Sequence, residues 1–353
     1  LGVMISASHN PMPDNGIKFF AHGGYKLPDQ VEDQIQELLN TSWDRPTGAA
    51  VGEVEYDDDW AEKSYIEHLM ASLGTDLHGL RIAVDCANGG ASFLAPEAFR
   101  QAGADAVVIN AAPDGRNIND KAGSTHPEQL QALTVASEAD FGVAYDGDAD
   151  RCLAVDRDGN IVDGDKIMGS LAVHMRDEGQ LAKDTLVVTV MSNLGLILAM
   201  QEAGIKTVQT GVGDRYVLEA MLEGGYSLGG EQSGHIIAKK YATTGDGILS
   251  SLLLARMVKE SGRDLADLTS FIKRLPQTLI NVGGVDRSRA NTDPAVQEAV
   301  AAAEAVLGNT GRVLLRPSGT EPLVRVMVEA ATQSQADGVA SRLADVVKEN
   351  LAL

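Results

Sequence analysis

The sequence predicts an α/β fold built from a duplicated α/β domain, followed by a smaller α+β domain at the C-terminal end. Two observations support this prediction. A strand–helix–strand pattern occurs twice, and the corresponding residues Asn88 and Asn193, each just after a strand, are 105 positions apart. After residue 276 the order of strands and helices changes, which indicates a domain of another kind.

The first copy begins with GLRIAVDCANGG at residues 79–90, a buried strand and its turn. A helix at 91–104, closed by Gly103, and a strand at 105–110 follow. The second copy repeats this order, with its strand, helix and strand at residues 185–195, 196–205 and 206–216.

The opening stretch LGVMISASHNP is an apolar run, residues 1–5, that ends in a cluster of small polar and turn-forming residues. A helix at 28–40 follows, and we interpret this segment as the end of a third copy. Loops at the carboxyl ends of strands are where ligands bind in open α/β sheets, so Ser8 and His9 are candidate site residues. A turn with local side-chain hydrogen bonds is the structural alternative.

The C-terminal domain is predicted to contain a strand at 278–285, a helix at 293–308 and two strands within 311–330. A final helix carries apolar residues at helical spacing, namely Val339, Leu343, Val346, Val347 and Leu351.

Four domains are therefore expected, at residues 1–74, 75–174, 175–276 and 277–353. Because the chain starts inside a strand, we expect the first domain to lack its N-terminal part. We further expect residues 1 to about 60 to be poorly ordered, rearranged or paired with the edge of another chain, unless a separate N-terminal fragment is present. The chain alone should then have little or no activity, and adding back the N-terminal segment should restore it.

Composition excludes several classes of partner. With 29 basic and 50 acidic residues the net charge is −21, which disfavours nucleic acid and anionic membranes. No apolar run approaches the roughly 18 residues of a membrane span. Cys86 and Cys152 lie in apolar strand-like runs and read as buried thiols of a cytoplasmic protein.

The strongest motif is FGVAYDGDADR, in which a strand runs into Asp146, Asp148 and Asp150. Three carboxylates this close repel one another unless a cation lies among them, and oxygen ligands select Mg²⁺ or Ca²⁺. An EF-hand is excluded, because its sixth and twelfth positions would be Arg151 and Arg157. A phosphatase that uses an aspartyl phosphate remains an alternative, as does a purely structural polar turn.

Three further loops carry polar side chains. RPSGTEPLVRV offers two arginines and two hydroxyls around a glycine for an anion, or else forms a plain hairpin. GGEQSGH places Glu231, Ser233 and His235 at alternate positions, which suits a sugar or a structural hairpin. In TGVGDRYV, Asp214 and Arg215 stand at a predicted helix start, without the third glycine of a dinucleotide site.

Taken in order, SASHNP, DGDADR, GEQSGH and RPSGTEP resemble the phosphoserine, metal, sugar and phosphate loops of the α-D-phosphohexomutases. The resemblance covers the whole chain. It implies three related α/β domains, the first incomplete, and a smaller α+β domain around a central cleft. GEQSGH with VGDRYV upstream is most similar to members acting on amino-sugar phosphates, since members acting on mannose or glucose phosphates more often carry Met in place of Gln232.

The resemblance implies that phospho-Ser8 exchanges a phosphoryl group with a hexosamine phosphate through a 1,6-bisphosphate that turns around in the site. One Mg²⁺ per chain and a hexose 1,6-bisphosphate, as activator and intermediate, are the implied cofactors. The implied catalytic residues are Ser8, His9, Lys18, Arg151 and His235, and the implied metal ligands are Ser8, Asp146, Asp148 and Asp150. The implied binding residues are Glu231 and Ser233 for the sugar, Arg316, Ser318, Gly319, Thr320 and Arg325 for a phosphate, and Asp214 and Arg215 as candidate substrate contacts.

Several alternatives stay open at this point. Arg151 would support the phosphoserine, whereas Lys18, His9 and His235 are all candidates for the proton acceptor. The expected partner is a small phosphosugar, with no nucleic acid and no membrane, and a homodimer is the assembly to consider. A phosphomannomutase or phosphoglucomutase specificity, a non-catalytic sugar-phosphate or Ca²⁺-binding protein, and a phosphatase that uses Asp146 as nucleophile are the competing functions.

Overall fold

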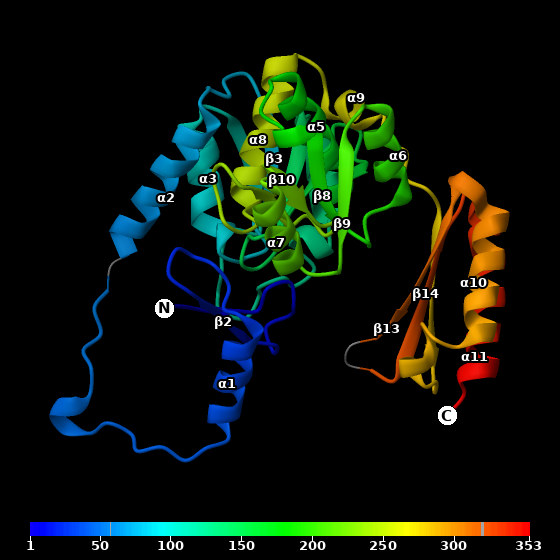
Figure 1. Ribbon diagram of the computed structural model, residues 1–353. Coiled ribbons are helices and arrows are strands. Elements are labelled where there is room, and N and C mark those ends of the chain that lie inside the picture. Colours follow the sequence, from blue (N-terminus) through cyan, green and yellow to red (C-terminus); the bar gives the residue numbers. More distant parts are fainter. Residues whose placement is uncertain (57, 319–320) are drawn as a thin grey trace. The chain divides into compact units, whose positions relative to one another are not determined.

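The computed structural model describes residues 1–56, 58–318 and 321–353 of the chain. These residues form two compact units, each traced in Figure 1. The first unit contains residues 1–191 and 203–271, and the second contains residues 192–202 and 272–353.

The first unit opens with an antiparallel hairpin of β1 (Gly2–Ser6) and β2 (Gly16–Phe20). In its register Met4 faces Lys18 and Ser6 faces Gly16, so Ser6 and Lys18 project from the same face. Helices α1 (Asp29–Leu39) and α2 (Asp58–Leu73) follow. The strand at 1–5 and the helix at 28–40 were both predicted, whereas the second strand of the hairpin was not.

A mixed sheet with the strand order β4-β3-β5-β6-β7 comes next. Strands β3 and β5 are buried along almost their whole length and pair in parallel, as expected for the centre of an α/β sheet. The strands are β3 (Arg81–Asp85), β4 (Asp105–Ile109), β5 (Phe141–Tyr145), β6 (Cys152–Asp156) and β7 (Ile161–Val162). The helices of this segment are α3 (Ala91–Gln101) and α4 (Glu128–Ala136).

The second sheet of this unit has the order β11-β10-β8-β9. Its strands are β8 (Thr185–Thr189), β9 (Lys206–Thr210), β10 (Leu228–Gly230) and β11 (Ile236–Ala238). The helices in this part of the chain are α5 (Gly164–Asp177), α6 (Leu194–Glu202), α7 (Asp214–Gly224), α8 (Gly247–Ser261) and α9 (Leu265–Thr269), of which α6 belongs to the second unit.

The two sheets share one topology, which confirms the predicted duplication. In each, a central strand pairs in parallel with the next strand on one side and a later strand on the other. The later strand then forms an antiparallel pair with the strand that follows it. The loops after the equivalent strands β5 and β10 carry the DGDADR and GEQSGH motifs.

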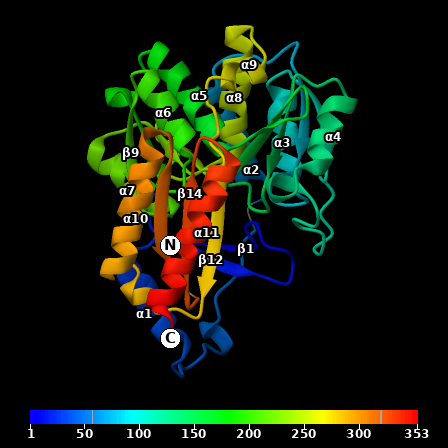
Figure 2. The ribbon, with the colours of Figure 1, turned by 90° about the vertical axis from the view of Figure 1, so that its right-hand side faces the viewer.

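The second unit is an antiparallel sheet with the order β12-β14-β13, covered on one face by helices. Its elements are β12 (Gln277–Gly283), α10 (Pro294–Leu307), β13 (Arg312–Pro317), β14 (Leu323–Glu329) and α11 (Gln333–Leu351). Figure 2 shows α10 and α11 side by side on that face. The predicted apolar stripe of α11 packs here, with Val339, Leu343, Val347 and Leu351 buried and Val346 partly buried.

Asp293 caps α10 with its side chain, and Pro294 occupies the first turn, where a missing N–H costs nothing. None of the helices that the structure describes is both long and apolar enough to cross a membrane.

Candidate active site

The acid motif forms the loop between β5 and β6. Asp146, Asp148 and Asp150 each bring one carboxylate oxygen to within 4.8 Å of the others. In each residue one oxygen (Oδ2 of Asp146, Oδ1 of Asp148 and of Asp150) is buried without a hydrogen-bond partner among the described residues. Buried carboxylate oxygens ordinarily have partners, so this donor set fits a divalent cation with oxygen ligands.

The electrostatics of the triad support this interpretation. Asp146 is fully buried, and burial together with the charges of Asp150 and Asp148 raises its pKa to about 7. Burial also raises the pKa of Asp150, but His235 and Lys18 act more strongly in the opposite direction, so its pKa lies below the ordinary value. Burial and the neighbouring negative charges therefore oppose full ionisation of the triad, and they act most strongly on Asp146.

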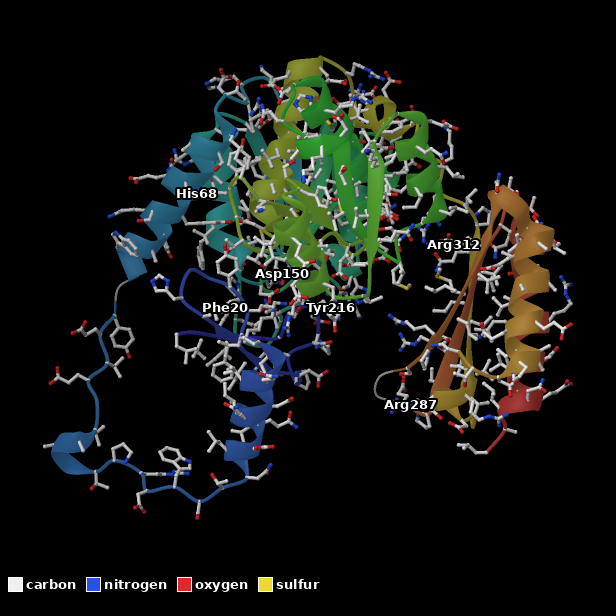
Figure 3. The ribbon with its side chains drawn as sticks, viewed as in Figure 1. Phe20, His68, Asp150, Tyr216, Arg287 and Arg312 are labelled. Carbon is white, nitrogen blue, oxygen red and sulfur yellow. The ribbon has the colours of Figure 1, made fainter. Side chains whose placement is uncertain are left out.

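The N-terminal hairpin brings a cation and a hydroxyl to this cluster (Figure 3, where Asp150 and Phe20 of β2 are labelled). Lys18 Nζ lies 2.5 Å from Asp148 Oδ2 and 3.2 Å from Asp150 Oδ2. Ser6 Oγ donates to Asp148 Oδ2 over 2.7 Å. Although burial lowers the pKa of Lys18, its bonds to both carboxylates raise it overall. Lys18 was expected from the family resemblance, whereas Ser6 was not among the expected site residues.

Ser8 lies in the turn after β1 with a left-handed backbone, φ 51°. Its N–H donates to Ser6 Oγ over 2.8 Å, and its Oγ lies 3.4 Å from Nδ1 of the exposed His9. The carbonyl of Ser8 accepts the N–H of Gly147 over 3.0 Å, which places the Ser8 loop directly on the acid loop. Burial and the nearby Arg151 lower the pKa of His9.

Arg151 and His235 complete this part of the site. Arg151 Nε lies 3.9 Å from Asp146 Oδ2, is buried, and donates to no acceptor among the described residues. The buried His235 accepts the Gly245 N–H at Nε2 over 2.9 Å, which leaves the ring proton on Nδ1, 3.5 Å from Asp150 Oδ2.

Of the two predicted alternatives for the GEQSGH segment, the structure has the hairpin, in which β10 and β11 pair antiparallel. Residues 231–234 form a turn closed by a bond from Gly234 N–H to the carbonyl of Glu231, because β10 ends at Gly230 and β11 starts at Ile236. As a result Ser233 is exposed whereas His235 is buried. Glu231 Oε1 accepts the Gly213 N–H over 3.2 Å.

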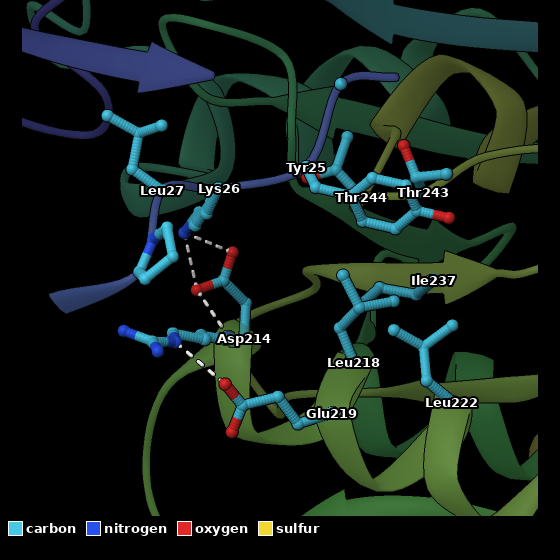
Figure 4. Close-up of a pocket in the computed structure, with 13 residues that line it drawn as sticks. Tyr25, Lys26, Leu27, Asp214, Leu218, Glu219, Leu222, Ile237, Thr243 and Thr244 are labelled. Atoms are coloured by element: carbon cyan, nitrogen blue, oxygen red, sulfur yellow. Dashed lines mark hydrogen bonds and ion pairs between the residues drawn. The ribbon is translucent and has the colours of Figure 1, made fainter. Parts of the chain in front are cut away.

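Asp214 and Arg215 start α7 as predicted and line a pocket of about 170 Å³, shown in Figure 4. Lys26 donates to both oxygens of Asp214, over 2.6 and 2.5 Å. Arg215 Nε donates to Glu219 over 2.9 Å. Asp214 Oδ2 also lies 3.3 Å from His235 Nε2, so this pocket borders the acid cluster.

The phosphate loop belongs to the second unit. Arg316 and Arg325 face each other directly on β13 and β14, and burial together with the Arg325 charge lowers the pKa of Arg316. Arg325 Nε is buried without a partner among the described residues, and Ser318 is buried. Two opposed guanidinium groups repel one another, so the pair fits an anion. Gly319 and Thr320 lie outside the described residues.

Arg287, which was not among the predicted site residues, contacts this loop. Its Nη1 donates to the carbonyl of Ser318 and, over 3.3 Å, to that of Glu321. Arg287 and Arg312 lie at opposite ends of this unit in Figure 3. No motif around residue 287 indicates this role, because the contact spans 31 positions of sequence.

A second cluster, His174, Glu178 and Glu260, also brings ligand atoms within 4.8 Å of one another. Here Arg256 donates to Glu178 over 3.1 Å and to Glu260 over 2.8 Å. The two glutamates are exposed and already have a cationic partner, so the aspartate triad fits a metal ion better than this cluster does.

Comparison with known proteins agrees with this geometry. A phosphoglucosamine mutase of Bifidobacterium longum subsp. infantis is 62% identical over 362 aligned positions, which cover all of this chain and 78% of the relative. The phosphoglucosamine mutase of Kineococcus radiotolerans is 60% identical and covers 100% of the chain and 79% of the relative. The chain belongs to the phosphoglucosamine mutase family.

Phosphoglucosamine mutases are α-D-phosphohexomutases, so the resemblance in the sequence motifs is confirmed, and the chain is an isomerase. Its segments match the phosphoglucomutase/phosphomannomutase family descriptions: α/β/α domain I at residues 1–45, domain II at 63–159, domain III at 163–275 and the C-terminal domain at 279–346.

Solved structures show the same fold. The Aspergillus fumigatus N-acetylphosphoglucosamine mutase, in complex with GlcNAc-6P and magnesium, matches with a TM-score of 0.77 at 22% identity over 99% of this chain and 89% of its own. A phosphoglucomutase/phosphomannomutase family protein from Burkholderia thailandensis matches with a TM-score of 0.78 at 24% identity, over 99% and 76% of the two chains.

Proposed function

We propose that the chain interconverts glucosamine 6-phosphate and glucosamine 1-phosphate through phospho-Ser8 and an enzyme-bound glucosamine 1,6-bisphosphate. The observation that supports this most directly is the aspartate triad, each member of which has one buried oxygen without a hydrogen-bond partner among the described residues. The Ser8 turn contacts the loop that carries this triad. The names of the close relatives support the choice of sugar.

In this proposal one Mg²⁺ is held by Asp146, Asp148, Asp150 and the phosphate on Ser8. When bound, it neutralises negative charge on the phosphoryl group in transfer. Arg151 has a free, buried Nε beside the triad and would donate to the same phosphate. An unphosphorylated Ser8 Oγ would act as the nucleophile when the group returns from the sugar.

The attacking sugar hydroxyl needs a proton acceptor within hydrogen-bond reach. Lys18 and His235 both contact Asp150 and flank the triad, and His9 adjoins Ser8 Oγ. Lys18 is partly exposed and lies on a strand whose face points to the triad. Its bonds to Asp148 and Asp150 hold it as an ammonium, so it could accept a proton only once a metal ion takes over those carboxylates. We propose it as the first of the three to test.

The remaining loops would hold the rest of the substrate. Glu231 and Ser233 are proposed to bind ring hydroxyls, with Asp214 and Arg215 as further contacts. In the second unit Arg316, Arg325 and Ser318 are proposed to anchor the phosphate that is not reacting, with Gly319 and Thr320 as part of the same loop.

A phosphomannomutase or phosphoglucomutase activity is the second candidate, because the domain families carry those names. The position at which hexose-specific members more often have Met is occupied by Gln232. Its Nε2 donates to Asp165 over 3.1 Å, which fixes the side chain against α5.

The experiment is intact-mass analysis before and after incubation with glucose 1,6-bisphosphate and Mg²⁺, followed by mapping of the phosphate. We expect one phosphoryl group on Ser8 of the wild type and none on the Ser8→Ala variant. Turnover is then measured on glucosamine, glucose and mannose phosphates, and we expect glucosamine phosphate to be preferred. Phosphate on Asp146 instead would support a phosphatase and refute the proposal.

A further inference from the structure

Asn119 connects the Ser8 loop to the acid loop from a third segment of the chain. Its Nδ2 donates to the carbonyl of Ser8 and to that of Asn10, each over 2.8 Å. Its own N–H donates to the carbonyl of Ala87, in the loop after β3, over 2.9 Å. Asn119 is 5% exposed, so these bonds are shielded from water.

The chemistry of these contacts requires an asparagine amide. Both partners are carbonyl oxygens, which accept and cannot donate, so only the NH₂ end of the side chain can face them. The backbone of Asn119 is left-handed, φ 57°, a conformation that asparagine tolerates better than most residues. An aspartate of the same shape would place a carboxylate against two carbonyl oxygens.

Gly147 leaves the space for this arrangement. A Cβ on Gly147 would lie 2.4 Å from the carbonyl oxygen of Ser8 and 2.8 Å from Asn119 Nδ2. The Ser8 carbonyl therefore receives two donors, Gly147 N–H and Asn119 Nδ2, at a point where the three loops are in direct contact. Both donors act on the backbone of Ser8 itself and leave its side chain free.

We propose that Asn119 is a positioning residue that fixes the phosphoserine loop against the acid loop, so that the phosphate on Ser8 reaches the ion held by the triad. This inference rests on the proposed function, because it requires phospho-Ser8. The Asn119 side chain donates to the backbone carbonyls of Ser8 and Asn10 rather than to Ser8 Oγ. Asn119 would therefore affect whether the phosphate on Ser8 and the aspartate triad can bind the same ion.

Coupling of this kind has a specific signature. In the wild type, phosphorylation of Ser8 should tighten Mn²⁺ binding, because the phosphate adds a ligand. In Asn119→Ala the triad is intact, so the unphosphorylated form should keep its Mn²⁺ affinity within about twofold. The increase in Mn²⁺ affinity on phosphorylation, called the gain below, should shrink by roughly tenfold. This is the size expected for two lost hydrogen bonds of ordinary strength. Asn119→Asp should lose more of this gain than Asn119→Ala.

The test is titration calorimetry with Mn²⁺ on both forms of each variant, with the phosphorylated form prepared from glucose 1,6-bisphosphate, together with steady-state kinetics. We expect kcat to fall by roughly 10- to 100-fold with KM for the phosphosugar little changed. Asn117→Ala is the matched control, because its side chain bonds only within the same loop, to Asp114 N–H and the carbonyl of Ala112. Asn117→Ala should keep the full increase in Mn²⁺ affinity on phosphorylation.

Two outcomes would overturn the inference. Asn119→Ala could keep the gain and kcat, or it could lose Mn²⁺ affinity equally in both forms, which would indicate a merely structural role. If Asn119→Ala does not fold, Asn119→Asp, which has the same shape, supplies the same comparison. Failure of the wild type to accept phosphate on Ser8 is a separate result, and it would refute the proposed function on which this inference rests.

Discussion

At the scale of single residues, the first unit holds like charges together at a cost to stability. Two unit charges about 4 Å apart repel by about 4 kcal/mol at an effective dielectric constant of about 20. Asp146 bears this most strongly, because it is fully buried and its pKa is raised to about 7. Clusters of this kind mark functional sites, where stability is given up for binding.

We predict that Asp146→Asn stabilises the metal-free protein and abolishes its response to Mg²⁺. The amide removes one charge from the triad, and the expected gain is about 1–2 kcal/mol. The wild type should gain about 2.7 kcal/mol when Mg²⁺ is present at about 100 times its dissociation constant, whereas the variant should gain almost nothing. Thermal unfolding with and without Mg²⁺ measures both effects.

Asp158→Asn, which removes an exposed charge from the turn between β6 and β7, is the control and should retain the full Mg²⁺ response. An Asp146→Asn variant that is less stable without metal and still stabilised by Mg²⁺ would show that the triad is a structural turn.

Sequence motifs predicted the candidate chemical residues better than the residues that position their loops. The triad, Ser8 and His235 lie in motifs whose residue types and spacing indicate their chemistry, whereas Lys18 was expected only from the resemblance to the phosphohexomutases. Asn119 could not be selected in either way, because an asparagine in a loop has no distinctive spacing, and its partners Ser8 and Asn10 are 111 and 109 positions away. Such contacts depend on how loops pack, which no local pattern encodes.

At the scale of elements, the hairpin of β13 and β14 places two arginines of the second unit, Arg316 and Arg325, next to each other. The register of the two antiparallel strands places Arg316 opposite Arg325, and like charges directly opposite destabilise a sheet. Arg287 bonds to the carbonyls of Ser318 and Glu321 and so braces both sides of the loop that joins the strands.

We predict that Arg325→Met weakens phosphosugar binding without weakening the hairpin. Loss of a charged contact to phosphate costs about 1.5–3 kcal/mol, so KM should rise by roughly 10- to 150-fold. The hairpin should keep or gain stability, because the variant removes the positive charge that faces Arg316 across the two strands. Steady-state kinetics and thermal unfolding in inorganic phosphate measure the two effects.

The exposed Arg342→Met on α11 is the matched control, and its KM should equal that of the wild type. An unchanged KM in Arg325→Met would remove Arg325 from the anion site.

The elements themselves were largely predictable. Strands β3 and β8 are short apolar runs bounded by turn signals, and α3 ends at Gln101, two residues before Gly103, the glycine predicted to close it. For residues 231–235 the sequence left a sugar-binding set and a structural hairpin open, and the structure has the hairpin. Alternation in sequence does not distinguish a strand from a turn between two short strands, so the pattern alone could not decide. Pairing of β1 with β2 was missed, since the loop between them carries the site motif rather than a hairpin signal.

At the scale of the whole chain, the equivalent asparagines of the duplicated copies have separate roles. Asn88 Oδ1 accepts the Ala112 N–H within the first unit. Asn193 belongs to the second unit, where its Nδ2 donates to Glu329 Oε1 over 3.0 Å and to the carbonyl of Leu275. The start of α6 is thus tied to β14, although the sequence order places it between β8 and β9.

Glu329 is the centre of that connection. It is 0% exposed and accepts from Arg312 Nε over 2.7 Å and from the Leu194 N–H over 2.9 Å, in addition to its bond from Asn193. Removing one partner of a buried ion pair leaves the other charge uncompensated, which typically costs about 3–5 kcal/mol.

We predict that Glu329→Gln destabilises the second unit and leaves the metal loop of the first unaffected. In hydrogen–deuterium exchange, peptides from 192–202 and 312–329 should exchange much faster, because Arg312 is left without its buried counter-charge. The protection that Mg²⁺ gives to the loop at 146–150 should be the same as in the wild type, since the three aspartates are in the other unit.

Glu349→Gln on α11 is the control, because it removes a charge at an exposed position of the same unit as Glu329. Equal acceleration in the metal loop would mean that the two units unfold as one, and no acceleration in 192–202 would mean that α6 is not held through Glu329.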